Sequence, residues 1–334
     1  MNALDRPIGI AGAGSIGCFV GGMLVAAGRK VALVARPRVV DEIRGDGLRL
    51  TDFDGSEQRL AASKITVSDD PSILSDAGAV LVTVKSADTA DMAGIIARHA
   101  PEDAAVVSLQ NGVGNVGVLR QYLPGRKVLG GMVPFNVVAL GAGRFHRSTS
   151  GAIVVERDAA GTAQRLSVPG LAMRATDNID GVQWGKLVVN LNNALNALSD
   201  IPLRQQLAQR NWRQLFADQM AEGLAVIGAE GIKAVSPTPV PAGLMPPLLR
   251  LPDAIFMTLL GRTMKIDPQA RSSMWQDLKR GRRTEIDYLQ GVITDIADRR
   301  GLKAPLSRRI VELVKRAEAA GKGSPGLTPE QIRG

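Results

Sequence analysis

A run of 22 residues without one charged side chain, Pro7–Gly28, constrains the fold of this chain more than any other feature. A helix of that length is long enough to cross a bilayer, and its place near the N-terminus imitates a signal peptide. The run holds seven glycines, however, with no basic segment before it and no convincing processing site. We therefore expect a buried element of a folded domain, no contact with a membrane, and a cytoplasmic protein.

The composition excludes several classes of protein. The 334 residues are about two domains' worth of chain, and 45% hydrophobic with 22% charged residues is typical of globular proteins. A single cysteine, Cys18, excludes an internal disulfide and a cysteine-rich metal site. Two histidines, His99 and His146, disfavour a metal centre and a Ser-His-Asp triad, so we expect no metal. The net charge of +9 favours an anionic partner.

Within the uncharged run, residues 12–17 form the pattern G-x-G-x-x-G directly after a predicted strand, 8–11, and at the start of a predicted helix, 16–27. A second strand, 30–35, follows at the expected distance along the sequence. The order strand, helix, strand disfavours the alternative of a merely glycine-rich turn. The first glycine of the pattern permits the tight turn, the second lets the backbone approach a pyrophosphate, and the third allows close packing of helix on sheet. The predicted cofactor-binding residues here are Gly12, Ala13, Gly14, Ser15, Ile16 and Gly17.

Arg36 stands at the end of the second strand, where a carboxylate would accept hydrogen bonds from the ribose of NAD. Its planar guanidinium is suited to bind the 2′-phosphate of NADP, which an acidic side chain would repel. The alternative is a solvated surface arginine. NADP(H) is therefore the predicted cofactor.

Two further buried strands are predicted at 79–84 and 104–109, and the alternation of strands with amphipathic helices indicates an α/β fold with a parallel sheet. Lys85 and Asn111 directly follow these strands, at the carboxyl edge where open α/β sheets bind ligands. Asn111 precedes a glycine, so an ordinary turn is an equal alternative for it.

After about Gly181 nearly every segment has helical spacing, so we predict a dinucleotide-binding domain over 1–180 and a helical domain over 181–334. The insert 235–251 contains five prolines, which predicts a loop or an extended arm. The apolar stretch 254–260 fits either the core or a partner surface, and the core is favoured.

The segment 181–198 is unusual for a surface helix because it contains several asparagines, which are poor interior helix residues. Lys186, Asn190 and Asn193 recur at i, i+4 and i+7 and therefore share one face, opposite a row of leucines. This face is interpreted as a substrate-facing stripe in which Lys186 gives a proton or holds an anion. The alternative is a helix packed against polar backbone.

A second polar segment runs from Ser272 to Tyr288. Gly281 is predicted to end one helix, and Thr284 with Asp287 resembles an N-cap for the next, which would put Ser273 and Glu285 in the first turns of consecutive helices. The basic cluster 279–283 is interpreted as a solvated helix end rather than a nucleic-acid site, because aromatic residues are only 3% of the chain.

In order and spacing, these motifs resemble the 2-dehydropantoate 2-reductase (ketopantoate reductase) family over nearly the whole chain. The resemblance implies an N-terminal Rossmann domain and a C-terminal all-α domain like that of 6-phosphogluconate dehydrogenase. It also implies reduction of 2-dehydropantoate to pantoate with NADPH, a step of pantothenate and coenzyme A biosynthesis. The motifs that carry the resemblance are the glycine-rich turn, Lys85, Gln110-Asn111-Gly112, Trp184-Gly185-Lys186 with Asn190, Ser272-Ser273-Met274 and Thr284-Glu285-Ile286-Asp287.

The resemblance also implies roles for single residues. Lys186 matches the family's catalytic lysine and Glu285 its acidic partner, whose carboxylate would favour the protonated lysine. The lysine would stabilise and protonate the oxygen of the reacting carbonyl as hydride adds to C2. The matching substrate and nicotinamide positions are Asn111, Asn190, Ser273 and Asp277; Asn193 joins them from its place on the helix face.

Two features depart from the family's pattern. The family often has a further asparagine eight residues after the lysine, where this chain has Ala194, and the insert 235–251 is longer than compact reductases need. They leave open a reductase of another branched 2-oxo acid. A non-catalytic NADP(H) sensor that signals through the apolar stretch 254–260 is a further alternative, nucleic-acid binding is a distant one, and a homodimer stays open.

Overall fold

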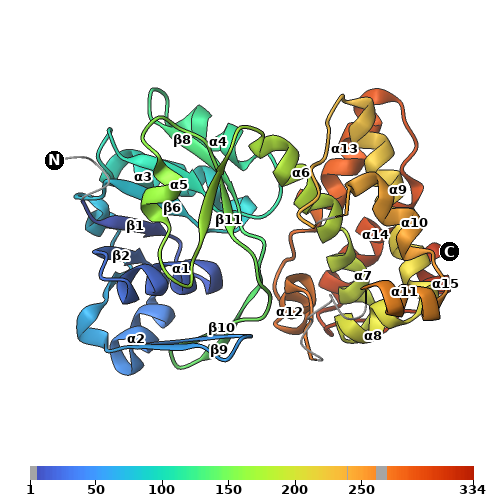
Figure 1. Cartoon of the computed structure of the whole chain (residues 1–334), viewed down its shortest axis with the longest axis horizontal. Coiled ribbons are helices and arrows are strands. Elements are labelled where there is room, and N and C mark those ends of the chain that lie inside the picture. The colour runs from blue at the N-terminus through green and yellow to red at the C-terminus, as the bar shows by residue number, and fades with distance from the viewer. Residues whose placement is uncertain (1–5, 239, 261–268) are drawn as a thin grey trace. The chain divides into compact units, whose positions relative to one another are not determined.

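The computed structural model describes residues 6–238, 240–260 and 269–334. The chain divides into two compact units, Met1–Ile179 and Asp180–Gly334 (Figure 1). The first unit is built on two β-sheets with helices, and the described part of the second unit is helical.

The larger sheet of the first unit is the framework of a dinucleotide-binding fold. Its strands are β1 (Ile8–Ala11), β2 (Val31–Val34), β5 (Thr66–Ser68), β6 (Ala79–Val82), β7 (Ala105–Ser108), β8 (Val128–Met132), β11 (Ile153–Glu156) and β12 (Met173–Thr176). Their order is β12-β11-β8-β7-β6-β1-β2-β5, and every neighbouring pair is parallel except β8 with β11. The order reverses between β1 and β6, so the carboxyl ends of these two strands form the switch point where such sheets bind ligands. The predicted Rossmann fold is confirmed, with one antiparallel neighbour added.

Helices cover both faces of this sheet. One face carries α3 (Thr89–His99) and α4 (Asn115–Tyr122), whose Met92, Ile96 and Leu119 are buried against the strands. The other face carries α1 (Ser15–Ala26) and α5 (Thr162–Leu166), and α2 (Pro37–Asp46) follows β2. With both faces covered, β1, β2, β6 and β7 are buried throughout, as expected for parallel strands.

A second, four-stranded sheet lies on the other side of α1 (Figure 1). Its strands are β3 (Leu48–Asp52), β4 (Glu57–Leu60), β9 (Val137–Gly141) and β10 (Arg144–Arg147), in the order β4-β3-β10-β9. A Cβ on Gly21 would lie 2.7 Å from Leu33 of the larger sheet, and one on Gly22 would lie 2.7 Å from Leu50 of the smaller sheet. The uncharged run is therefore a helix with protein on both sides. Of the residues described, none belongs to a helix long and apolar enough to cross a membrane.

The second unit contains α-helices and 3-10 turns in its described residues, as predicted. Its core is formed by α7, α9, α13 and α14, which pack on one another through buried apolar side chains. The helices are α6 (Ile179–Asn190), α7 (Asn192–Ser199), α8 (Leu203–Ala208), α9 (Arg210–Ala229), α10 (Met245–Leu249), α11 (Asp253–Leu260), α12 (Ser273–Lys279), α13 (Gln290–Arg300), α14 (Pro305–Ala320) and α15 (Pro329–Arg333), with 3-10 turns η5 (Ala242–Leu244) and η6 (Ile286–Tyr288).

The prediction of a loop or extended arm at 235–251 was wrong for its second half, which contains η5 and α10. Pro246 and Pro247 occupy the first turn of α10, where a proline removes no hydrogen bond of the helix. The first half begins against α6, because the Val235 N–H donates to the Gly181 carbonyl at 2.8 Å. The insert is therefore a packed part of the helical unit.

One buried arginine holds the end of the insert in place. Arg213 of α9 has no exposed surface, and its guanidinium donates to backbone carbonyls of α8 and of the end of the insert. It also forms an ion pair with Asp253 at 2.7 Å and lies over the Phe256 ring at 4.2 Å. The carbonyls that it contacts are those of Leu207, Ala208, Leu249 and Leu251. Because its donors are shared among several segments, Arg213 ties α8, α10 and α11 to α9.

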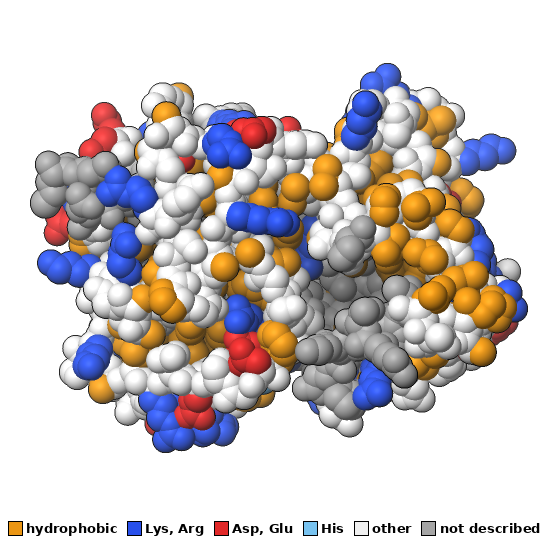
Figure 2. Space-filling view, viewed as in Figure 1, with side chains coloured by type: hydrophobic (Ala, Val, Ile, Leu, Met, Phe, Trp, Pro, Cys, Tyr) orange, Lys and Arg blue, Asp and Glu red, His pale blue; other side chains and the backbone are white. Residues whose placement is uncertain are grey.

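The prediction that 254–260 belongs to the core was wrong for most of its side chains. Phe256 is buried at 1% exposure, whereas Ile255 and Leu259 are 48% and 55% exposed. A helix beside α9 and α10 can bury only the face it turns toward them, so Ile255, Met257 and Leu259 stay at the surface. Hydrophobic side chains accordingly gather on this part of the helical unit (Figure 2).

Replacing Arg213 by alanine is expected to lower the free energy of unfolding of the helical unit by about 3–5 kcal/mol, because four carbonyls and a carboxylate lose their buried partner. Urea unfolding followed by circular dichroism measures the change. Arg210→Ala is the matched control, since Arg210 is an exposed arginine of the same helix that donates to Arg250 O. An equal loss in both variants would contradict the anchoring role.

Gly185→Ala is expected to destabilise the helical unit by roughly 1–3 kcal/mol through overpacking. A Cβ at this position would lie 1.7 Å from the Val235 carbonyl oxygen, so the start of the insert would have to move. Gly228→Ala in α9 is the control: no atom lies within 4 Å of its Cβ position, and alanine there should stabilise the helix by up to about 1 kcal/mol. Thermal melts compare the two, and a shift of the same sign in both would refute this account of Gly185.

Candidate functional site

The glycine-rich turn joins β1 to α1 in the geometry that its spacing predicts. Gly12 has a φ of +91°, and a Cβ there would lie 2.2 Å from the Val84 side chain, so glycine is required. A Cβ on Gly17 would lie 2.5 Å from Thr83 Oγ1. Thr83 itself donates to the Gly12 carbonyl at 2.8 Å, which fixes the turn to the strand end beside it.

Gly14 is the exposed member of the turn and the N-cap of α1. Its Cβ position has only the Gly12 carbonyl oxygen near it, at 4.0 Å, so space adjoins the backbone there. The residue makes no side-chain cap, and the first bond within the helix runs from Cys18 N to Gly14 O. An N-terminus of this kind presents backbone N–H groups and the positive end of the helix dipole to an anion.

The loops after β6 and β7 are joined by a buried polar network that sequence reasoning missed. Asn115 Nδ2 donates to the Asn111 carbonyl at 2.8 Å and to Ser86 Oγ at 3.2 Å. Gln110 Nε2 donates to Thr89 Oγ1 at 2.8 Å, and that hydroxyl lies 3.0 Å from Asn115 Oδ1. In the sequence, Gln110 was noted only as part of a motif, and Asn115, four residues after Asn111, was not singled out.

This network connects the two loops in which Lys85 and Asn111 lie. Lys85 is the N-cap of the 3-10 turn Ser86–Asp88, and Asn111 is exposed at the other loop while its carbonyl also accepts from Ser86 Oγ at 3.0 Å. Both follow strands at the carboxyl edge of the sheet, next to the switch point. Arg36 lies at the same edge, exposed, as the N-cap of α2 after β2. The first unit thus gathers all its predicted site residues at one edge.

In the second unit, Lys186 lies in α6, partly buried, and desolvation lowers the pKa of its ammonium from 10.5 to about 8. Burial disfavours the charged form, a shift opposite to the one expected from an acidic neighbour. Asn190 is buried at the end of the same helix, four residues further along. A lysine whose pKa lies close to neutral pH is suited to give up a proton during a reaction.

The predicted helix 181–198 is interrupted at Leu191, between α6 and α7, although the Leu191 N–H still donates to Leu187 O at 3.0 Å. Asn193 lies in α7 and is partly buried. Two other asparagines of the segment, Asn192 and Asn196, are buried and donate to Gln206 of α8. Asn192 and Asn196 are therefore held by other parts of the protein, as the structural alternative for this segment expects.

The two serines at the start of α12 differ in environment. Ser272 is buried as the N-cap of α12: its hydroxyl accepts from Trp275 N at 3.1 Å and donates to Asn193 O at 2.9 Å. Ser273 is exposed at the first position of the helix. Asp277, four residues later, shares its face of the helix. Of the pair, Ser273 is the serine whose hydroxyl is presented to solvent.

The predicted N-cap formed by Thr284 with Asp287 was wrong. Thr284 Oγ1 accepts from Ile286 N at 3.2 Å, and the N-cap position of η6 is Glu285, which is partly buried. Asp287 instead forms an ion pair with Lys315 of α14 at 2.7 Å. Only a short 3-10 turn follows, because the chain must turn again before α13.

Helix α14 holds the turn that contains Glu285. Glu318 Oε1 accepts from the Thr284 N–H at 2.7 Å, and the ion pair between Lys315 and Asp287 raises the pKa of the lysine. Both contacts come from one side of α14, three residues apart, so a single helix face fixes the backbone on either side of Glu285. Neither contact has a local signal in the sequence.

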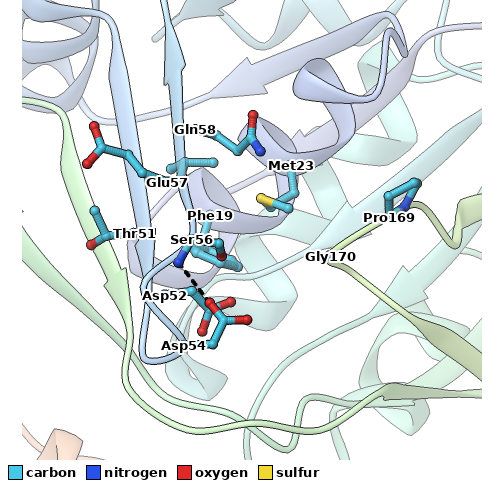
Figure 3. A pocket seen from close by; sticks show the side chains of 11 residues that line it. Phe19, Met23, Thr51, Asp52, Asp54, Ser56, Glu57, Gln58, Pro169 and Gly170 are labelled. Atoms are coloured by element: carbon cyan, nitrogen blue, oxygen red, sulfur yellow. Dashed lines mark hydrogen bonds between the residues drawn. The ribbon is translucent and has the colours of Figure 1, made fainter.

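A cavity of about 280 Å³ lies between α1 and the smaller sheet (Figure 3). Phe19 and Met23 form its apolar wall, and the carboxylates of Asp52 and Asp54 lie at one end. These carboxylates are already engaged, because Asp52 pairs with Arg147 and Asp54 accepts from Ser56 N at 2.9 Å. Both carboxylates are therefore held by protein partners, and in the described chain no cluster of acidic, histidine or cysteine residues has the makings of a metal site.

Comparisons with known proteins agree along nearly the whole chain. Residues 8–159 match the family model of ketopantoate reductase PanE/ApbA, and residues 178–318 match that of the ketopantoate reductase PanE/ApbA C-terminal domain. The curated 2-dehydropantoate 2-reductase of Halobacterium salinarum is 30% identical over 324 residues, which is 93% of this chain and 99% of the relative. That of Pyrococcus horikoshii is 28% identical over 322 residues, 94% of this chain and 98% of the relative.

Solved structures show the same fold. The crystal structure of a PanE/ApbA family ketopantoate reductase from Ralstonia eutropha JMP134 superposes with a TM-score of 0.80 at 33% identity, covering 95% of this chain and 99% of the other. The ternary structure of D-mandelate dehydrogenase with NADH and anilino(oxo)acetate, at 24% identity and a TM-score of 0.79 over 94% and 99% of the two chains, is alike in fold. Both halves of the chain match their family models in order, and the chain is an oxidoreductase that belongs to the ketopantoate reductase family.

Proposed function

We propose that this protein reduces 2-dehydropantoate to pantoate with NADPH and that Lys186 is its general acid. The observation that carries the proposal is the position of Lys186: a partly buried ammonium whose pKa is lowered to about 8, in a chain whose curated relatives are named 2-dehydropantoate 2-reductases. Such an ammonium can both stabilise negative charge on a carbonyl oxygen and protonate it.

The glycine-rich turn suits a dinucleotide. Gly12 adopts a backbone conformation that favours glycine, and Gly14 has open space beside its backbone, so a pyrophosphate can approach the N-terminus of α1. When bound there, a nicotinamide cofactor would supply the hydride for C2 of the substrate. Arg36 holds the 2′-phosphate, and Lys85 and Asn111 line the same edge of the sheet.

The helical unit orients the substrate and moves the proton. Lys186 donates its proton to the carbonyl oxygen of C2 as charge develops there. Glu285, the second proposed catalytic residue, lies in the turn that α14 holds. Asn190, Asn193 and Ser273 hold the carboxylate and hydroxyl of the substrate, with Asp277 beside them. Fixing these groups turns binding energy into orientation.

Lys186→Ala is expected to lower kcat/KM for 2-dehydropantoate by about 10²–10⁴-fold, because the proton donor and its charge are both lost. NADPH oxidation followed at steady state measures it. Lys233→Ala, at an exposed lysine of the same unit, is the control and should retain wild-type activity. Full activity of Lys186→Ala would exclude the lysine as the acid.

The rate of reduction is expected to fall as the pH rises through about 8, the pKa of Lys186, since the acid must be protonated to act. Above that value kcat/KM should drop about tenfold for each pH unit. The reverse reaction needs the neutral amine, so pantoate oxidation should instead rise through the same pH. Profiles of kcat/KM against pH for reduction and for oxidation test this opposite dependence. Two profiles that change in the same direction would rule out a single ionising group that serves both reactions.

Arg36→Ala is expected to raise the KM for NADPH by roughly 10–100-fold and to leave that for NADH nearly unchanged, because only NADPH has the 2′-phosphate. Arg38→Ala is the matched control, since Arg38 is exposed two residues later but donates to Glu42 at 2.8 Å. A wild-type enzyme that prefers NADH would overturn the choice of cofactor.

One observation favours a second candidate, a reductase of another branched or bulky 2-oxo acid. Ala194 replaces an asparagine that the family often has, and its side chain is fully buried in α7, so this position offers no polar group to a substrate. Rates across a panel of 2-oxo acids decide between the two. Turnover of another acid above that of 2-dehydropantoate would select the second candidate, and no turnover of any would favour a cofactor-binding sensor.

A further inference from the structure

We propose that Asn196, Ser272 and Asp200 are positioning residues: they anchor α12 to α7 and thereby set Ser273 relative to Asn193 for binding of the 2-oxo acid. The inference rests on the proposed function and adds residues that do not touch the substrate. We call the hydrogen bonds of these three residues the α12 anchor.

Helix α12 needs an anchor because it is short. It has seven residues, and only Met274 and Leu278 among them are buried. Two apolar side chains alone do not define the rotation or the axial position of such a helix against its neighbour. Hydrogen bonds, which are directional, must therefore fix the rotation and the axial position of α12 against α7.

Ser272 supplies the first contact and uses its hydroxyl in both directions. Its Oγ accepts from Trp275 N at 3.1 Å, which caps α12, and donates to Asn193 O at 2.9 Å, which belongs to α7. Ser272 directly precedes Ser273, and Asn193 is the residue whose backbone it binds. This one side chain therefore links the backbones of the two proposed substrate-binding residues.

Asn196 supplies the second contact from inside the core. Its side chain is fully buried, with Oδ1 accepting from Ser272 N at 2.8 Å and Nδ2 donating to Ile201 O at 2.9 Å. A buried amide with these contacts is costly to displace, because each lost partner leaves a polar group unsatisfied. Asn196 therefore holds the start of α12 against α7 and against the turn that follows α7.

Asp200 supplies the third contact, one turn further along α12. It ends α7 in the left-handed region at φ 56°, and its Oδ1 accepts from Trp275 Nε1 at 2.7 Å and from Arg271 at 3.2 Å. The Arg271 guanidinium and the Lys279 ammonium lie 4.6 and 4.8 Å from the centroid of the Trp275 ring. The indole is thus fixed in orientation, which prevents α12 from rotating about its axis.

The test compares Ser272→Ala with Ser272→Thr, which keeps the hydroxyl. Ser272→Ala should raise the KM for the 2-oxo acid by about tenfold or more, with kcat changed less than about threefold and the KM for NADPH unchanged, because misplacing Ser273 weakens substrate binding. Ser272→Thr should restore most of the wild-type KM. A role in stability alone would lower the melting temperature and the active fraction but leave KM as it was, and that result would overturn the proposal.

Trp275→Phe provides a second variant, since it removes the indole N–H that binds Asp200 but keeps an aromatic ring at this position. It should raise the same KM by about threefold, and amide hydrogen exchange in α12 should quicken in both Ser272→Ala and Trp275→Phe while exchange in α13 stays slow. Unchanged exchange in α12 would refute the anchor regardless of activity. Two further measurements separate the anchor from the proposed function. A wild-type protein that does not turn over 2-dehydropantoate rejects the proposed function. A KM that rises in Ser273→Ala but not in Ser272→Ala rejects only the anchor.

Discussion

The packing of α1 between two β-sheets is the constraint on which the first unit depends. A helix covered on both sides has no face for charged residues, which explains why Pro7–Gly28 contains none. Gly21 lets the larger sheet approach and Gly22 lets the smaller one approach, so both spacings depend on absent side chains. Because the same helix begins at the glycine-rich turn, its fixed position also fixes the direction of the N–H groups at the switch point.

The smaller sheet is held to this layer by a charged contact in an apolar setting. Arg147 of β10 pairs with Asp52 of β3, and its guanidinium lies 5.4 and 5.2 Å from the ring centroids of Phe19 and Phe135. An unpaired charge in this place would be costly, whereas the carboxylate and the two rings compensate it. The larger sheet, whose edge carries the proposed cofactor residues, is therefore supported by a layer that itself contains none of the proposed site residues.

What could be predicted from the sequence was local. The first strand, the glycine-rich turn and α1 lie within 20 residues of one another, so their pattern was visible, and strand 8–11 was placed to the residue. The smaller sheet was not predicted as a sheet of its own, because its central pairing joins Arg49 to Arg144, far apart in sequence, and parallel partners leave no local mark. The insert was misjudged for the same reason, since the residue that orders it, Arg213, lies on another helix.

The helical unit shows the same limit at the level of single side chains. Periodicity places Lys186 and Asn190 on one helix face and the leucine row on another, yet it does not predict which asparagines of the segment bond to other parts of the protein. That difference depends on partners far along the chain, such as the Ser272 N–H for Asn196. Likewise, only the resemblance distinguished Ser273 from Ser272 in the sequence, whereas the structure distinguishes them physically because Ser272 is the buried one.

The two units position their proposed site residues by different means. In the first, glycines and a network of buried hydroxyls and amides fix the backbone, so a side chain at Gly12 or Gly17 would disturb the turn itself. In the second, side chains hold the backbone next to the proposed site residues. Asn196 accepts from the Ser272 N–H, beside Ser273, and Glu318 accepts from the Thr284 N–H, beside Glu285. A residue beside such an anchor can change without loss of the anchor, so the proposed substrate residues can vary more freely than the glycines of the proposed cofactor site. The buried Ala194, next to Asn193, fits such a division.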